Sequence, residues 1–300
     1  MTTDKTEAPT TPAKPRRNAW LIAGGAVTAV VLLAAVASAG ALIWIASAPR
    51  ETDSRADAYG SVASVDMSVA AGSVELTGAD GPELSVETDM SWKGSEPEIE
   101  EELTADGVFE VRARCGEDYL FWMIVSQCEV DYSAAVPSGA PVAVETTTAG
   151  IDIDGLEGAL DVETTTGEVY ARNLRTSGAP VAMETTTAGI DIDGLEGALD
   201  VGTTTGEIDA RGLRTSGASV ETTTGDVTVA FEELRGDVDI TTTTGDVTVL
   251  VPDDGTVYEV RYDSTTGEED IGIATDPSET DGRVIDVSTT TGDLEVRYTS

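Results

Sequence analysis

The 300-residue sequence contains no histidine and only three lysines, Lys5, Lys14 and Lys93. Histidine is the usual general base near neutral pH and a common metal ligand, so its absence excludes histidine-dependent hydrolases and histidine-containing metal sites. Aromatic residues make up only 5% of the chain, with just three phenylalanines. A thick globular core is therefore not expected, whereas the plentiful valine, isoleucine, leucine and alanine can build a thin one.

Positive charge is also scarce, because 17 basic residues face 56 acidic ones and leave a net charge of -39. Such a chain repels nucleic acid and anionic membrane surfaces and favours cationic partners. Its acidic motif IDIDGLEG fits neither the EF-hand loop nor the Gly-Gly-x-Gly-x-Asp calcium repeat. We therefore expect no nucleic-acid partner, no cofactor and no metal site. Diffuse divalent cations that screen the self-repulsion remain a hypothesis.

One long apolar run is present, since residues 19–48 carry no charge. The run exceeds the roughly 20 residues that a membrane-spanning helix needs, follows basic residues, and has Trp20 and Trp44 near its ends as membrane-interface anchors. We predict a disordered cytoplasmic tail at residues 1–18, a single transmembrane helix at 19–48 and a polar stalk at 49–60. The domain that follows is then extracellular, and the membrane is a partner of the chain.

A cleaved signal peptide is the alternative for the same run. Its support is Ala46-Ser47-Ala48, which has the small-x-small form of a cleavage site. The apolar run is well beyond the usual signal-peptide core of about 7–15 residues, which favours an uncleaved anchor.

An internal repeat dominates the rest of the sequence. The segment ETTTAGIDIDGLEGALDV occurs at Glu145–Val162 and, unchanged, at Glu184–Val201, an offset of 39 residues. Glycines end the threonine runs about every 20 residues, and such a unit must stack on its neighbours to cover its apolar face. We predict an all-β fold, a β-solenoid (β-helix-like) ectodomain of eight coils stacked in chain order. Residues 61–140 form its N-terminal part with a disulfide loop or cap, and residues 141–300 form its threonine-rich repeats.

A β-sandwich would also show short alternating strands. The unchanged 39-residue copy favours the solenoid, because an added pair of coils lengthens an open stack without disturbing strand pairing. The alternation also predicts which side chains face inward, which face water and which glycines make turns. The predicted interior residues are Val142, Val144, Ile151, Ile153 and Leu156, the outer ones Glu145, Asp152 and Asp154, and the turn glycines Gly150 and Gly155.

The threonine runs 146–148, 164–166, 203–205 and 222–224 are expected to stack as ladders whose hydroxyls hydrogen-bond between coils. A flat threonine array could instead bind ice, or its hydroxyls could carry O-linked sugars. Acidic residues interrupt the array and the coil lengths vary, which disfavours ice binding.

Cys115 and Cys128 are the only cysteines. They lie on the oxidising side of the proposed anchor, so we predict a disulfide between them, worth about 3 kcal/mol for a loop of this size. The loop holds the most apolar stretch of the ectodomain. It is interpreted either as a cap on the first coil or as a docking loop for a partner. The residues concerned are Tyr119, Phe121, Trp122, Met123 and Ile124.

The lone cysteine pair, the strand CEVDYSAAVPSG and the repeated V-x-T-T-T-G-x-V/I coils together resemble the bacterial putative-adhesin, cell-surface β-solenoid family, a domain of unknown function. The resemblance spans Val62 to Tyr298. It implies a surface location and an adhesive or envelope-related role, and it brings no catalytic residues.

These observations predict a non-catalytic, membrane-anchored cell-surface protein, an adhesin or structural interaction module with an unidentified surface ligand. The alternative is an envelope-stress or regulatory membrane component that binds another protein through the apolar cysteine loop. A glycoside-hydrolysing enzyme is a third hypothesis, because paired carboxylates hydrolyse glycosides in some β-helices. That reaction needs a cleft and one carboxyl of raised pKa, and the sequence shows neither.

Overall fold

The computed structural model describes residues 50–116, 127–276 and 283–299, and every regular element in these ranges is a β-strand. None of the three ranges contains a helix long and apolar enough to cross a membrane. The predicted transmembrane helix at 19–48, with Trp20 and Trp44, lies outside the described residues. The all-β prediction is confirmed for the part of the chain that is described.

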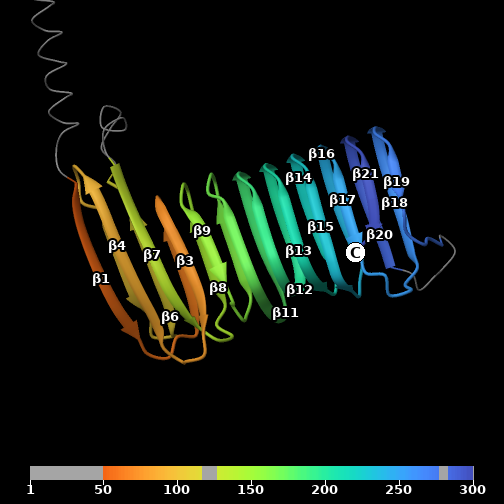
Figure 1. The fold of residues 1–300 in the computed structure, drawn as a ribbon. Coiled ribbons are helices and arrows are strands. Elements are labelled where there is room, and N and C mark those ends of the chain that lie inside the picture. The colour runs from red at the N-terminus through yellow and green to blue at the C-terminus, as the bar shows by residue number, and fades with distance from the viewer. Residues whose placement is uncertain (1–49, 117–126, 277–282, 300) are drawn as a thin grey trace, which may run out of the picture. The chain divides into compact units, whose positions relative to one another are not determined.

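Most strands pair in parallel and build two sheets that face each other across the core (Figure 1). One, here the threonine sheet, runs in the order β5 (Glu98–Leu103), β6 (Val108–Arg114), β2 (Ser64–Val69), β8 (Val142–Thr146), β10 (Leu160–Thr164), the second parts of β11 (Val169–Thr187) and β12 (Ile190–Thr205), β14 (Ala218–Thr224), β16 (Val238–Thr244), β20 (Arg283–Thr291) and β18 (Tyr258–Thr266).

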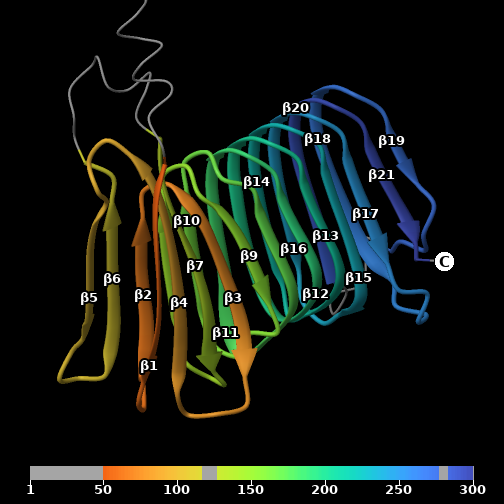
Figure 2. The same ribbon diagram turned by 60° about the vertical axis from the view of Figure 1, so that its left-hand side comes forward.

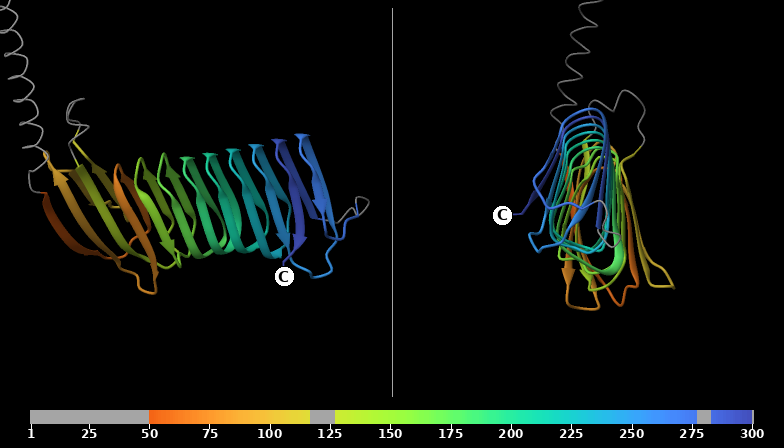
Figure 3. Two further views of the ribbon diagram at one scale, coloured as in Figure 1. Left: turned by 45° about the horizontal axis from the view of Figure 1, so that its top comes forward. Right: turned by 90° about the vertical axis from the view of Figure 1, so that its right-hand side faces the viewer.

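The other, here the arginine sheet, runs in the order β1 (Glu51–Tyr59), β4 (Leu84–Lys93), β7 (Gln127–Pro137), β3 (Gly72–Ala79), β9 (Gly150–Asp154), the first parts of β11 and β12, β13 (Ile208–Thr215), β15 (Val227–Leu234), β17 (Val247–Val251), β21 (Leu294–Tyr298) and β19 (Glu269–Ile271). The chain passes from one sheet to the other in each coil, as the view along the stack shows (Figure 3).

The core is a set of aliphatic columns that run from coil to coil. One column in the arginine sheet is at most 1% exposed throughout and consists of Ile151, Val169, Ile190, Ile208, Val227, Val247 and Leu294. Burying each such side chain contributes about 1.5–3 kcal/mol. The five interior residues predicted from the repeat are all buried, and the three predicted outer carboxylates are not.

The turn glycines are only partly as predicted. Gly155 has a φ of +69°, a left-handed conformation that favours glycine. The expectation for Gly150 is wrong, because its φ is not left-handed and a Cβ there would meet nothing within 4 Å. Gly150 is the first residue of β9 and can accept a side chain.

The coils do not stack in chain order at the C-terminal end, which corrects the expectation of successive windings. The last coil, β20 with β21, lies between the β16–β17 coil and the β18–β19 coil. Glu269 shows why, since it is the register partner of Leu294 and so occupies the position that valine, isoleucine or leucine fills in the coils beneath. An exposed carboxylate suits the outermost coil, whereas buried inside the stack it would carry a large desolvation penalty.

The N-terminal end also departs from chain order, because the β2–β3 coil lies between the β6–β7 coil and the β8–β9 coil. This end contains antiparallel pairs as well. Here β5 pairs with β6, and β1 with β4 and β4 with β7, all antiparallel (Figure 2). Most of the segment 49–60, predicted as a stalk, is therefore the edge strand β1. Its residues 51, 53, 55 and 57 pair with positions of β4 whose side chains are buried, and they are Glu51, Asp53, Arg55 and Asp57. Inward-pointing charges on an edge strand hinder pairing with another chain, so a polar sequence is compatible with a strand here.

Candidate functional site

The outer surface of the threonine sheet is acidic, without basic residues of its own, from β2 to β16. Seven of its strand segments, from β2 through β16, contain no lysine or arginine. Their outward carboxylates form two columns. The first column comprises Asp66, Asp161, Asp200 and Asp239, and between each aspartate and the next lies one strand with alanine or serine at the equivalent position. The second column comprises Glu145, Glu163, Glu184 and Glu221.

Glu145, Glu163 and Glu184 stand on three adjacent strands and are direct register partners. Strands in a sheet are about 4.8 Å apart, and like charges placed directly opposite each other are destabilising. With Thr165, Thr186 and other residues, the three glutamates line a shallow depression of about 260 Å³. This acidic surface has a regular spacing and no counter-charge from its own strands.

The threonine triplets divide their side chains between the core and the surface. The first threonine of each triplet is buried, whereas the second and third are exposed in most coils. Buried hydroxyls pair at 2.8 Å between Thr146 and Thr164 and again between Thr185 and Thr203. The predicted ladder is therefore confirmed for these coils. It is wrong for Thr222, whose buried hydroxyl has no hydrogen-bond partner.

The outer surface of the arginine sheet, in contrast, carries charges that alternate in sign. Two columns, here called the charge ladders, run from coil to coil. The first is Asp154, Arg172, Asp193 and Arg211, and the second is Glu157, Arg175, Glu196, Arg214 and Glu233. Ion pairs join Arg172 to Asp152 at 2.7 Å and Arg214 to Glu232 at 2.7 Å, so arginines of this surface pair with acidic neighbours.

One acidic patch on the arginine sheet was not predicted. Asp191, Glu207 and Asp209 line a shallow cavity of about 270 Å³ beside the exposed ring of Tyr170. Burial raises the pKa of the Asp209 carboxyl, and Asp191 and Glu207 raise it further, although Arg211 opposes the shift. The sequence signal was a difference between two equivalent segments, VYAR at residues 169–172 and IDAR at residues 208–211. The second segment has Asp209 in place of a tyrosine, and Asp209 is the register partner of Asp191.

A partly buried polar network at the N-terminal end was also missed. The Glu101 carboxylate accepts hydrogen bonds from Tyr132 at 3.1 Å, Tyr59 at 3.3 Å and Thr88 at 3.4 Å. Burial raises the pKa of Tyr59 to about 12, and the Glu101 charge adds to this shift. Alternation in EIEEEL could have revealed the network, because it places Glu101 on the inner face with Ile99.

Replacing Glu101 should destabilise this end of the stack. In Glu101→Ala two tyrosines and a threonine lose their common acceptor, so we expect the free energy of unfolding to fall by about 2 kcal/mol. Glu102→Ala is the matched control, because Glu102 is exposed and points to the other face. Urea unfolding of both full-length variants measures the difference. Equal losses would show that the network contributes nothing specific.

The predicted disulfide between Cys115 and Cys128 is present, with 5.9 Å between the Cα atoms. Cys115 follows β6 of the threonine sheet, whereas Cys128 lies in β7 of the arginine sheet. The bond therefore joins the two sheets at the N-terminal end, where β5 and β1 leave open edges. The apolar loop residues Tyr119, Phe121, Trp122, Met123 and Ile124 lie outside the described residues.

Within the described ranges, no three aspartate, glutamate, cysteine or histidine side chains are grouped so that they could hold a metal ion. The cavities around the repeats are shallow surface depressions of about 260–300 Å³. Among the described residues, the most extended features are two outer surfaces, one acidic and hydroxyl-rich along β2 to β16 and one on which acidic residues and arginines alternate.

The stacked parallel coils define a solenoid-like β-protein. Residues 158–297 match the model of the family described as Toastrack DUF4097, so this part of the chain is a Toastrack domain. The resemblance predicted from the sequence is thereby confirmed for these residues. No curated protein matches the chain.

Several solved structures are similar over most of their length, at low identity. A putative adhesin from Bacteroides fragilis is 11% identical with a TM-score of 0.44, and the match covers 83% of this chain and 97% of that one. A putative lipid binding protein from Parabacteroides distasonis is 10% identical with a TM-score of 0.41, covering 85% and 98%. A putative cell adhesion protein from Clostridium sporogenes is 10% identical with a TM-score of 0.28, covering 83% and 100%.

Proposed function

We propose that this chain is a non-catalytic, membrane-anchored cell-surface protein that binds cationic surface ligands through the outer face of its threonine sheet. The uncharged run at 19–48 and the basic residues before it support an anchor with a cytoplasmic N-terminus. The contrast between the two sheets along the repeats carries the proposal, because arginines pair with acidic residues on the arginine sheet, whereas segments β2 to β16 of the threonine sheet contain no basic residue.

The geometry favours a multivalent ligand over a small molecule. An exposed carboxylate paired with an ammonium group contributes only about 0.2–1 kcal/mol, so one contact binds weakly. Columns of carboxylates repeated from coil to coil can engage many ammonium groups of one polymer or basic protein, and linked contacts raise the apparent affinity. The exposed threonine hydroxyls beside the columns add hydrogen-bonding groups.

Neutralising the glutamate column should weaken such binding. Glu145→Gln, Glu163→Gln and Glu184→Gln together remove three contacts of about 0.5 kcal/mol each, so we expect the Kd for a short poly-lysine to rise about tenfold. The control carries the same change in charge on the arginine sheet, Glu168→Gln, Asp191→Asn and Glu207→Gln. Titration of the full-length variants with the labelled polymer, at low and high salt, measures both.

Other outcomes of this titration separate the alternatives. Equal weakening in both triple variants would show that only net charge matters and would refute a dedicated face. Calcium at matched ionic strength should compete with the polymer if divalent cations also screen the glutamate column. For the alternative role, a regulatory component that binds a protein through the disulfide loop, the observation in favour is that the bond joins both sheets at one end. Replacing residues 117–126 by a glycine-serine linker would then abolish partner binding and leave polymer binding intact.

A further inference from the structure

The 39-residue repeat corresponds to two coils of opposite charge character. Its first part, residues 145–162, supplies the acidic members of the charge ladders, Asp154 and Glu157. Its second part, residues 163–183, supplies the basic members, Arg172 and Arg175. The copy that follows repeats this order, with an acidic part at 184–201 and a basic part at 202–220.

The two acidic parts are identical in sequence, so direct stacking would place each carboxylate on its own copy. Asp154 would then face Asp193, and Glu157 would face Glu196, at the roughly 4.8 Å spacing of neighbouring strands. Like charges directly opposite each other are destabilising. In the structure Arg172 instead lies between Asp154 and Asp193 in the register.

The apolar core places no such restriction on the order of coils. In both acidic parts the inward residues are the same, so Ile151 would stack on Ile190 and Ile153 on Ile192 without a change of volume. The threonine segments are equally interchangeable, because each begins with a buried threonine such as Thr146 or Thr185. The outer charges, and not the core, therefore distinguish a tolerated neighbour from an unfavourable one.

We propose that the 39-residue segment is a length cassette that carries equal numbers of acidic and basic ladder residues. A whole cassette can be gained or lost with both ladders still alternating, whereas the basic part cannot be lost alone. Each cassette changes the length of the stack by about 10 Å and adds two strands to the threonine sheet. The length of the acidic face can thus vary while both ends of the stack keep their sequences.

Two excisions test this in the full-length chain, purified in mild detergent. Excision of residues 145–183 joins Val144 to Glu184, which repeats the natural junction of Val144 with Glu145. Excision of residues 163–183 joins Val162 to Glu184 and stacks the two acidic parts. We expect the first variant to melt within about 2 °C of the parent, because each coil contacts only its neighbours. The second should melt about 5 °C lower at low ionic strength, and high salt should reduce this deficit.

A pair of substitutions separates charge from any other defect of the shorter variant. In the 163–183 excision, Asp154→Arg with Glu157→Arg restores alternation against Asp193 and Glu196 and should raise the melting temperature. In the parent the same pair would face Arg172 and Arg175 and should lower it. The proposal is overturned if the pair acts in the same direction in both backgrounds, if the two excisions melt alike at low salt, or if the 145–183 excision does not fold.

Discussion

Gly245→Ala is expected to lower the melting temperature of the full-length chain by about 10 °C or more, although it adds a single methyl group. A Cβ at Gly245 would lie 1.9 Å from the carbonyl oxygen of Gly225 and 2.5 Å from its carbonyl carbon, and the φ of Gly245 is +152°. Both contacts are with backbone, so no side chain can move to relieve them. The coils would have to separate at this corner.

Separation would break the hydrogen bonds that hold the corner. The Gly245 amide donates to the Thr291 carbonyl at 3.0 Å, and the Gly225 amide donates to Thr244 at 2.9 Å. Loss of these bonds together with backbone strain should cost about 3 kcal/mol or more, and each kcal/mol lowers the melting temperature by about 2–4 °C in a domain of this size. The same close approach recurs at Gly206 and Gly292.

Gly150→Ala is the matched control, because it adds the same methyl group where nothing lies within 4 Å. Its melting temperature should stay within about 2 °C of the parent, or rise slightly, since alanine restricts the unfolded chain more than glycine does. Thermal unfolding followed by circular dichroism measures both variants. If Gly245→Ala and Gly150→Ala have the same melting temperature, the backbone at this corner adjusts to a Cβ more easily than its geometry indicates.

The repeat could be predicted from the sequence because its core is strictly periodic. Alternation placed Val142, Ile151 and Leu156 inside without reference to any neighbour, and the copied segment showed that coils stack. Periodicity does not distinguish glycines by role, however. Gly150 and Gly245 both end a threonine run, but only the second faces a carbonyl of the adjacent coil, and that contact depends on the three-dimensional register.

The two ends were harder to predict because there the local pattern competes with long-range pairing. The segment Glu51–Tyr59 is too polar to suggest a strand, and it becomes one only because β4 offers a free edge. Likewise, Glu101 acquires its role from Tyr59, Thr88 and Tyr132, which are distant in sequence. The candidate face was partly foreseen, since the acidity and threonine runs are compositional, but the absence of arginine from its segments β2 to β16 became clear only from the strand register.

A stop codon after Gly282 removes the last 18 residues and with them the β20–β21 coil. We expect this truncation to destabilise the chain more than an internal excision of 27 residues that removes the β18–β19 coil. Truncation takes away β20 and β21, whose side chains Ile285, Val287, Leu294 and Val296 are at most 1% exposed. It also leaves β18 and β19 without the coil on which they rest. We expect the free energy of unfolding to fall by roughly 5 kcal/mol or more.

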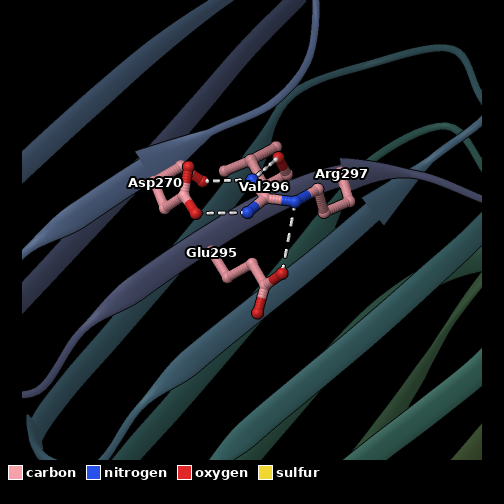
Figure 4. Close-up of polar contacts among 4 residues, drawn as sticks. All are labelled: Asp270, Glu295, Val296 and Arg297. Carbon is pink, nitrogen blue, oxygen red and sulfur yellow. Dashed lines mark hydrogen bonds and ion pairs between the residues drawn. The ribbon is translucent and has the colours of Figure 1, made fainter.

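Polar contacts tie the outer coil to the last one and would be lost with it. Arg297 of β21 donates a hydrogen bond to the main-chain oxygen of Asp270 in β19 at 2.9 Å and forms an ion pair with the Asp270 carboxylate (Figure 4). The hydrogen bond from Arg297 lowers the pKa of the Asp270 carboxyl. Glu295 contacts the same guanidinium at 3.3 Å. These contacts are exposed, so most of the expected loss comes from the apolar columns.

The 27-residue control is an excision of residues 256–282, which removes β18 and β19 and joins Gly255 to Arg283. It leaves six residues between Val251 and Ile285, the same number that separates Phe231 from Val238 in the preceding coil. Only one coil interface is lost, so the free energy of unfolding should fall by about 2–3 kcal/mol, mainly from the removal of buried Tyr258. Urea unfolding of both variants gives the comparison.

The order of these two losses depends on Glu269. After truncation the β18–β19 coil could dock on β16–β17 in place of the missing coil, and this would restore much of the lost burial. Docking would set Glu269 where Leu294 had been, against Val247 of the aliphatic column. A carboxylate beside that column is unfavourable, so the coil should stay detached and open to proteolysis. Glu269→Leu in the truncated chain should then recover stability, and a truncated chain already as stable as the excision variant would contradict the argument.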